Sequence, residues 1–458
     1  MGQTVKIRGI VIGDFQGGDA DNKRTLSGFF VQEVDNMVDS DPLTSEGIFV
    51  FQGSSSTTAV GLGDEVEVTG VVDEYFGETQ LKTISSITIL SSGNTLPTAA
   101  QVVLPTSGTT ISQDGNIQPD LEQYEGMLVV FPQLLTVTEQ FQLDRFNEIK
   151  LVQGQRPFTF TQTNSPNVTG YSSFLDKVGA RTITYDDGLS LQNQNIDFLD
   201  GFGPTYNTAN AIRMGDTIAN LKGVLSYLWA GNSASGSTWR VRSVQDGSNS
   251  FIKTNLRSSS SPSVGGTHKI VSMNVLNYFT TLAVTGATTF VGQSPRGANT
   301  QTEFDRQTTK LVTSILSLNA DILGLVEIEN DFREGVSSNA VAYLVNQLNI
   351  ATGSTRYDWV RPGVASVGTD AISCAFIFNK ETIRLEGSAR ILDSAAFVND
   401  ISSSSPRNRP AVAQSFSSVT STCDVTSSCI TLAVNHFKSK GSACDSPDLN
   451  DGAGNCKY

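Results

Sequence analysis

Histidine is scarce in this sequence, which has 2 histidines among its 458 residues. A zinc hydrolase that binds its metal through several imidazoles is therefore nearly excluded. Long hydrophobic runs are also missing, because stretches such as 128–131 and 375–378 fall far short of the roughly 18 apolar residues that a membrane-spanning helix needs. The sequence therefore predicts no membrane span, while its 38% hydrophobic content suffices for two or three domains with their own cores.

Basic residues are few at the front of the chain. Residues 1–120 contain 5 Lys or Arg and 16 Asp or Glu, so most of the net charge of −14 lies there. Affinity for a polyanion comes largely from Lys and Arg, so this region is poorly suited to hold nucleic acid. An acidic surface that keeps a secreted protein soluble explains the charge better than an acid-specific partner does. Nothing in the sequence indicates an obligate protein partner.

The start of the chain lacks the basic region, the apolar stretch and the cleavage site of a signal peptide. Cysteine usage nevertheless indicates an oxidising compartment, because four of the five cysteines lie close together on polar loops near the end. We expect them to form the disulfides Cys423–Cys429 and Cys444–Cys456. Zinc is the alternative, but no CxxC pair is present. The protein is therefore expected to be secreted, with its signal peptide outside this chain, and Cys374 to be a buried free thiol.

The first two thirds of the sequence read as β-structure. Five short strands separated by turns predict a small closed barrel in residues 1–92. The segment 63–71 resembles 215–224, since a Gly-Asp turn, a strand and a second glycine recur in both. We therefore expect a second OB-like barrel in 118–257, after a connector at 93–117. Arg240, Arg242, Lys253 and Arg257, near Trp229 and Trp239, are either a contact for a polyanion or ordinary solvated charge.

A Ser/Gly linker at 258–266 precedes a region with a different pattern of apolar residues. Apolar runs that predict strands alternate with helical stripes at 303–318 and 338–348. Strands interleaved with helices indicate an α/β domain, with helices packed over a sheet, in residues 267–458.

Three predicted strands of this region end in polar residues: Asn274, Glu327, and the pair Asn435-His436. Each alone has an ordinary explanation, as a turn former, a solvated acid or a structural histidine. Together they fit a site for a hard cation, because magnesium takes oxygen ligands from one or two carboxylates, waters and substrate phosphate. The sequence therefore predicts a magnesium site, with manganese or calcium as alternatives.

Five blocks in this region resemble the endonuclease/exonuclease/phosphatase superfamily, and most closely the bacterial ExeM/NucH-type extracellular nucleases, which also carry an OB-like region before the catalytic domain. The blocks are Lys269–Phe279, Asp321–Asp331, Gly368–Phe378, Arg407–Phe416 and Val434–Gly441. The resemblance implies a four-layered α/β sandwich that hydrolyses a phosphodiester with activated water and a divalent metal. The expected fold is thus multidomain, with two OB-like β-barrels followed by this sandwich, truncated at its C-terminal end.

The resemblance also implies a role for each matching residue. Glu327 corresponds to the metal-binding carboxylate, and Asn274 to the amide of the first strand, beside the metal. His436 corresponds to one of two active-site histidines, oriented by an acid for which Asp370 is the candidate. Arg409 is expected to contact the phosphate, and Asn435, Lys438 and Lys440 to line the same pocket. Arg409 could instead belong to a surface turn, and one of the two lysines could be merely solvated.

The leading hypothesis is an extracellular nuclease acting on DNA or RNA. A phosphatase or phospholipid diesterase of the same superfamily is the second, and a non-catalytic secreted protein built of OB modules is the third. The superfamily pattern continues with a Gly-Asp-x-Asn strand end and an Asp-His pair that this sequence lacks. The chain is therefore expected to be a fragment that is inactive alone.

Overall fold

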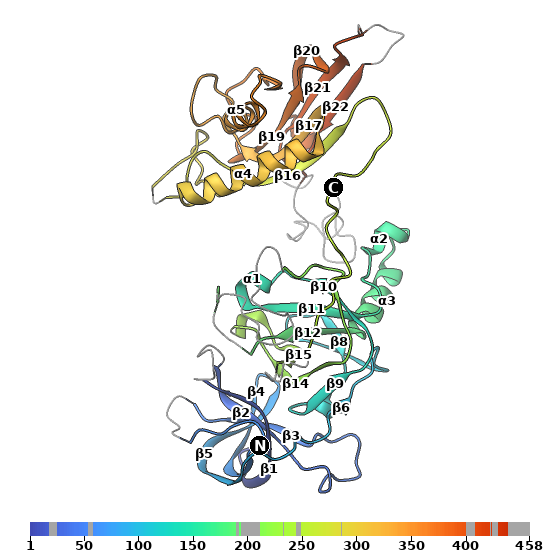
Figure 1. Ribbon diagram of the computed structural model, residues 1–458, viewed down its shortest axis with the longest axis vertical. Helices are drawn as coiled ribbons and strands as arrows, with labels where there is room; N and C mark the ends of the chain where they lie inside the picture. Colours follow the sequence, from blue (N-terminus) through green and yellow to red (C-terminus); the bar gives the residue numbers. More distant parts are fainter. Residues whose placement is uncertain are drawn as a thin grey trace. The chain divides into compact units, whose positions relative to one another are not determined.

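The computed structural model describes residues 1–17, 25–53, 58–188, 192–193, 211–231, 233–243, 249–284, 286–399, 408–421, 423 and 429–437. The chain divides into two compact units, Met1–Arg257 and Ser258–Tyr458 (Figure 1). Strands outnumber helices in the described residues, and each unit has buried cores of its own. The prediction of a β-rich protein with several domains is confirmed at this level.

The first unit opens with the closed five-stranded barrel that the sequence predicts. Its strands follow the order β1-β2-β3-β5-β4, with β3 and β5 parallel. In β4 every second side chain is buried, so Val66 and Val68 enter the core while Glu65 and Glu67 lie outside it. The strands are β1 (Thr4–Gln16), β2 (Thr25–Gln32), β3 (Gly47–Phe51), β4 (Glu65–Tyr75) and β5 (Glu78–Ser91).

The second β region of this unit, where a second OB-like barrel was expected, forms one large sheet. It is an eight-stranded sheet of order β13-β10-β11-β12-β15-β14-β9-β6. Its strands are β6 (Ala100–Gln101), β9 (Leu128–Phe131), β10 (Leu135–Glu139), β11 (Glu148–Gln153), β12 (Thr182–Asp186), β13 (Thr217–Ile218), β14 (Leu221–Leu228) and β15 (Thr238–Arg242). A separate hairpin, β7 (Thr109–Ile111) and β8 (Ile117–Pro119), and helices α1 (Leu143–Phe146), α2 (Phe160–Thr163) and α3 (Val168–Gly179) complete it.

The expected connector at 93–117 belongs to this sheet region. It supplies β6 and β7, and its Val102 and Leu104 are buried in the same core as the strands. The segment that connects the barrel to the sheet region therefore also contributes strands and apolar side chains to it.

The repeated Gly-Asp turn in the sequence is a repeated structure. Gly63 and Gly215 both have positive φ, of 83° and 99°. In each copy the aspartate carboxylate accepts a hydrogen bond of 2.8 Å from the backbone N–H three residues earlier, Gly61 to Asp64 and Arg213 to Asp216. The same turn thus precedes β4 of the barrel and β13 of the sheet.

Arg240 and Arg242 are buried within the sheet region, at 1% and 0% exposure. Both pair with the carboxylate of Asp186, and Arg240 also pairs with Glu148 at 2.8 Å. Two guanidinium groups enclosed in this way can neither reach a polyanion nor be solvated, so both interpretations made from the sequence are wrong for these two residues.

The second unit contains two packed sheets and two long helices. One sheet has the order β16-β17-β19-β18, with β16 and β17 parallel, and the other is the antiparallel β20-β21-β22. Both predicted helices are present, and α4 begins at a capping box of Thr300 and Glu303. The elements are β16 (Ile270–Tyr278), α4 (Gln301–Leu318), β17 (Ile322–Glu329), α5 (Ala340–Thr352), β18 (Tyr357–Trp359), β19 (Ile372–Asn379), β20 (Ile383–Leu392), α6 (Ala395–Val398), β21 (Ala411–Ser418) and β22 (Ile430–Val434).

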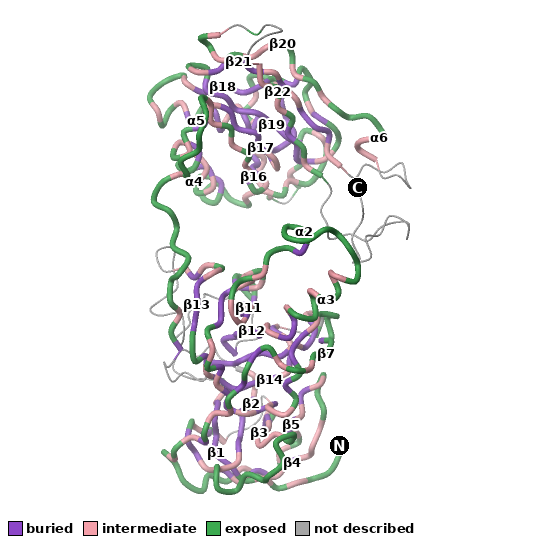
Figure 2. Tube along the Cα trace, turned by 90° about the vertical axis from the view of Figure 1, so that its right-hand side faces the viewer, coloured by how far each residue is buried: buried purple, intermediate pink, exposed green. Residues whose placement is uncertain are grey.

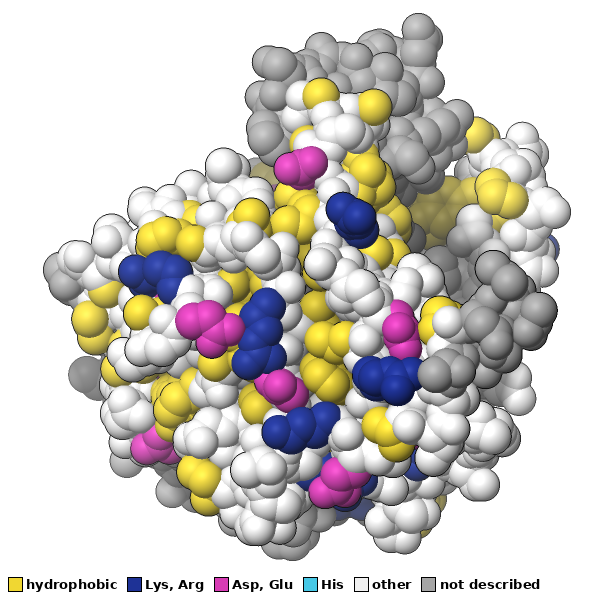
Figure 3. Space-filling model, turned by 90° about the horizontal axis from the view of Figure 1, so that it is seen from above, with side chains coloured by type: hydrophobic (Ala, Val, Ile, Leu, Met, Phe, Trp, Pro, Cys, Tyr) yellow, Lys and Arg dark blue, Asp and Glu magenta, His cyan; other side chains and the backbone are white. Residues whose placement is uncertain are grey.

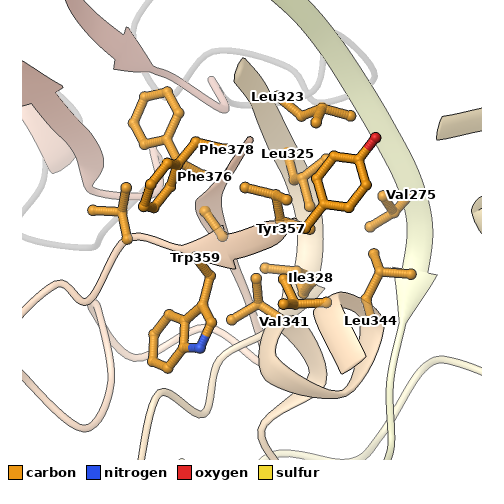
Figure 4. Packing of buried hydrophobic residues seen from close by; sticks show 14 of the residues in the cluster. Val275, Leu323, Leu325, Ile328, Val341, Leu344, Tyr357, Trp359, Phe376 and Phe378 are labelled. Carbon is orange, nitrogen blue, oxygen red and sulfur yellow. The ribbon is translucent and has the colours of Figure 1, made fainter. Parts of the chain in front are cut away.

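The sheet containing β17 and β19 is covered on both faces, as the buried strands in Figure 2 show. Side chains of α5, such as Val341 and Leu344, pack on one face (Figure 4). Val412 and Val434 of the second sheet belong to the same core. A Cβ at Gly324 of β17 would lie 2.6 Å from a methyl group of Val434, so glycine allows the two sheets to approach.

In the described part of the chain, no helix combines the length and the apolar character needed to cross a membrane.

Candidate cation and phosphate site

Glu327 lies at a bulge near the end of β17. Val326 pairs with Cys374 of β19 and Ile328 with Ser373, so Glu327 is an extra residue between two paired positions. Its φ of 66° is unusual for a residue with a side chain and costs about 1–2 kcal/mol. The buried apolar run before it sets the strand in the core, and the bulge leaves a carboxylate that is 19% exposed at the edge of the sheet.

The neighbouring strand β16 bulges at the same level. Asn274 pairs with Val326 and Tyr278 with Ile328, so three residues of β16 stand opposite the single residue Glu327. The Asn274 side-chain oxygen accepts a hydrogen bond of 2.7 Å from the N–H of Leu276. The N–H of Asn277 donates to Glu327 Oε2 at 3.2 Å, which ties this bulge to the carboxylate.

His436, just after β22, approaches the same carboxylate from the second sheet. Its Nε2 lies 3.8 Å from Glu327 Oε1, beyond direct hydrogen-bonding distance. Burial lowers the pKa of His436 and the nearby Arg409 lowers it further, while Glu327 and Asp370 act in the opposite direction. An imidazole with a pKa below its usual value is neutral at pH 7, so it can accept a proton.

Arg409, Asp370 and Arg296 form a charged group next to His436. The backbone N–H of Arg409 donates to the carbonyl oxygen of His436 at 3.3 Å, and its Nε donates to Asp370 Oδ2 at 2.8 Å. Arg296 Nη2 donates to the other carboxylate oxygen. Burial alone would raise the pKa of Asp370, but the two arginines more than offset it and hold this pKa below the ordinary value.

The loop that carries Asp370 is fixed by the amide of Asn330, which is fully buried after β17. Asn330 accepts a hydrogen bond from the N–H of Val367 at 2.8 Å and donates to the carbonyl oxygens of Val367 and Asp370 at 3.0 and 2.9 Å. Within the same loop, Gly368 has a φ of 72° and packs against Pro410, the residue after Arg409. One buried amide thus connects the ends of β17 and of the Asp370 loop.

The structure brings Glu327, His436, Arg409 and Asp370 together from four segments of the chain. Asn274 lies beside them in the strand register and is exposed. No hydrogen bond joins Asp370 to His436 in the described residues, because the Asp370 oxygens bind the two arginines, so its role in orienting the imidazole stays a prediction. Asn435 is exposed, and its amide donates to the carbonyl oxygen of Ala433 at 3.2 Å.

The remaining predicted residues fall into two groups. The disulfide Cys423–Cys429 is confirmed, and so is the buried thiol of Cys374, whose pKa burial raises to about 12. Lys438, Lys440 and the predicted disulfide Cys444–Cys456 lie outside the described residues.

Sequence reasoning did not single out Arg296 or Asn330 in this arrangement. Arg296 lies 74 residues before Asp370 in a segment without a pattern, so no signal could have found it. Asn330 stands inside one of the blocks that carry the resemblance, three residues after Glu327, so it could have been considered.

The donors around Glu327 suit a hard cation better than zinc. Among the described residues, no group of three or more His, Cys, Asp or Glu is arranged to hold a metal. Magnesium or calcium needs only one or two protein carboxylates, completed by amide oxygens, waters and phosphate. Glu327 Oε1 accepts no hydrogen bond from the described residues, with His436 Nε2 3.8 Å away, and the Asn274 amide oxygen lies on the adjoining strand.

One face of the molecule can be examined for a patch of basic residues. On the face drawn in Figure 3, Lys and Arg side chains are interspersed with Asp and Glu. A mixed surface of this kind produces no extended positive potential on this face.

No protein-family model matches the chain, and no curated protein is similar to it.

Proposed function

We propose that the Ser258–Tyr458 unit carries the active site of an extracellular, metal-dependent nuclease, which hydrolyses phosphodiester bonds of DNA or RNA by attack of water. One observation carries this proposal. A carboxylate in β17, an imidazole just after β22 and an arginine–aspartate pair from two loops come together, with His436 Nε2 3.8 Å from Glu327 Oε1 and the backbone N–H of Arg409 hydrogen-bonded to the carbonyl oxygen of His436. Three kinds of group needed for phosphodiester hydrolysis are therefore within reach of one phosphate.

Each residue has a role that follows from its chemistry. Glu327 and the Asn274 oxygen would hold a divalent cation, which supplies stabilisation for the negative charge that develops on phosphate oxygens. Arg409 uses Nε to bind Asp370, and its other guanidinium nitrogens have no partner in the described residues, so they can donate to the phosphate. His436 is neutral and can take or return a proton.

The finer fold assignments belong to the same proposal. The five-stranded closed barrel at the front is consistent with an OB-type barrel, a fold that binds oligonucleotides or sugars. In the second unit, helices on one face of a sheet and a second sheet on the other are consistent with the endonuclease/exonuclease/phosphatase sandwich. The Cys423–Cys429 disulfide supports an extracellular location.

The test is cleavage of supercoiled plasmid by the natural protein, with Mg²⁺ or with a chelator. We expect cutting only with the metal. Glu327→Gln keeps the shape of the side chain but removes its charge, so it should lower the cleavage rate by about 10²- to 10³-fold. Binding of Mn²⁺ to residues 1–458, followed by electron paramagnetic resonance, should be lost in the same variant.

The matched control is Glu381→Gln, because the Glu381 side chain is 62% exposed and pairs only distantly with Arg356. It should cut and bind Mn²⁺ as the unchanged protein does. Cleavage that persists in chelator or in Glu327→Gln would remove the cation site from the mechanism. Turnover of a phosphomonoester with none of plasmid would favour a phosphatase instead.

A further inference from the structure

Leu276 is an apolar residue in a costly position. Its φ is 55°, a left-handed conformation that is rare for a leucine, and 73% of its surface is exposed. A side chain so exposed gains little from the hydrophobic effect. Glycine would adopt the same backbone without the steric cost, so the stability of the fold does not explain a leucine here.

The surrounding contacts hold Leu276 in this conformation. Its N–H donates to the Asn274 side chain at 2.7 Å, and its carbonyl oxygen accepts from Gln307 at 2.8 Å. The next residue, Asn277, donates its N–H to Glu327 Oε2 at 3.2 Å. Leu276 is therefore fixed one residue away from a group that contacts the proposed cation ligand.

Phe437 is likewise one residue away from a group that approaches Glu327, in this case His436, which lies near Oε1. It follows His436, whose Nε2 lies 3.8 Å from Glu327 Oε1, and it is 58% exposed. Its ring has one aromatic neighbour in the described residues, Phe397 at 6.2 Å. Since consecutive Cα atoms are about 3.8 Å apart, both exposed apolar residues lie at the rim of the candidate site.

We propose that Leu276 and Phe437 contact the bases of a nucleic-acid strand whose phosphate is bound at Glu327 and Arg409, an inference that rests on the proposed function. An aromatic ring stacks on any base, and apolar side chains such as leucine pack against base steps. A phosphomonoester with no neighbouring nucleotide would leave both side chains in water.

A membrane surface is the other substrate that exposed apolar residues could meet. Binding to lipid requires a broad apolar face bordered by basic residues. Two single side chains beside a site that contains acidic groups fit that requirement poorly, so the observations favour nucleic acid.

The test measures binding of a fluorescein-labelled, single-stranded 12-nucleotide DNA to residues 1–458 by fluorescence anisotropy, with Ca²⁺ to avoid turnover. Leu276→Ala and Phe437→Ala should each weaken the Ca²⁺-dependent binding by about 5-fold or more. The matched controls are Leu256→Ala and Phe141→Ala, at 73% and 79% exposure, both in the first unit. They should bind as the unchanged chain does.

A second measurement does not depend on ligand. Leu276→Gly removes the steric cost of the left-handed backbone, so it should raise the melting temperature of the second unit by about 2–4 °C. A lower melting temperature would show that the leucine stabilises the fold, and would overturn the inference for this residue.

The outcomes separate this inference from the proposed function. If the unchanged chain binds DNA with Ca²⁺, Glu327→Gln abolishes the binding, and the two alanine variants bind normally, only the inference fails. If no Ca²⁺-dependent binding occurs at all, both fail. If the alanine variants keep DNA binding but lose binding to phosphatidylglycerol vesicles, the rim faces a membrane and the inference is overturned.

Discussion

At the scale of single residues, Gly368 controls how closely the Asp370 loop approaches Arg409. A Cβ at Gly368 would lie 2.8 Å from Cδ of Pro410, and its φ is 72°. Gly368→Ala should therefore displace Pro410 together with Arg409, and we expect a loss of about 2–4 kcal/mol in unfolding free energy. Urea unfolding checks the stability, and Ca²⁺-dependent DNA binding should weaken in parallel.

Gly363 provides the matched control for this substitution. Its φ is 81°, yet a Cβ there would meet nothing within 4 Å. Gly363→Ala should therefore cost only the backbone strain, about 1–2 kcal/mol, and leave DNA binding unchanged. Equal losses of unfolding free energy and of DNA binding in the two variants would mean that the contact with Pro410 has no influence on the site.

Residue types at strand ends were enough to predict Glu327, Asn274 and His436, because a carboxylate or an imidazole that interrupts an apolar strand is visible in the sequence. The conformation of Leu276 was not visible, since its positive φ accompanies a hydrogen bond that its N–H donates to Asn274 and one that its carbonyl oxygen accepts from Gln307. Arg296 was missed for a similar reason, because it reaches Asp370 only after the chain has folded.

At the scale of elements, Asn330 connects the end of β17 to the Asp370 loop. Asn330→Ala removes one acceptor and the donors from a buried position, and leaves the N–H of Val367 and the carbonyl oxygen of Asp370 unpaired. We expect the free energy of unfolding to fall by about 2–3 kcal/mol. Hydrogen-exchange mass spectrometry should show faster exchange in residues 366–372.

The exposed Asn299 supplies the control, and Asn299→Ala should leave exchange in 366–372 unchanged. Normal protection of this peptide in Asn330→Ala would show that other contacts hold the loop. The helices and strands around it were predicted well, because 303–318 carries a helical stripe and 321–327 an apolar run. Their contacts were not. The same is true of Arg240 and Arg242, whose charge suggested exposure, whereas both pair with the buried Asp186.

At the scale of the whole molecule, local patterns predicted the five-stranded closed barrel but not the eight-stranded sheet. Hairpin-connected strands such as β4 and β5 pair next to each other, so turn signals identify them. The sheet depends on pairs that are distant in sequence, such as the parallel pair of β12 with β15 and of β6 with β9. Nothing in a single strand specifies such a partner, which explains why a connector was predicted where β6 lies.

The junction of barrel and sheet within the first unit contains buried acids that should make its stability depend on pH. Glu125 is 6% exposed; its Oε2 accepts from the N–H of Thr79 in β5 at 3.1 Å, and its Oε1 has no partner in the described residues. Burial, with Glu78 and Glu122 nearby, raises the pKa of Glu125 to about 8 despite the hydrogen bond from Thr79. Burial also raises the pKa of Glu78.

A folded-state pKa above the unfolded value means that the folded protein holds a proton that the unfolded chain releases. The contribution of Glu125 to stability is therefore complete below about pH 4.5 and declines as pH rises to about 8, by on the order of 4 kcal/mol. Glu125→Gln keeps an oxygen for Thr79 without a titrating proton, so it should be clearly more stable than the unchanged chain at pH 9 and similar at pH 5. Urea unfolding in a Trp359→Phe background, where Trp229 and Trp239 report on the first unit alone, measures this. The control is Glu139→Gln, at a half-exposed position, which should keep the original pH dependence. If unfolding free energy plotted against pH runs parallel in Glu125→Gln and in the unchanged chain, Glu125 is ionised in the folded protein.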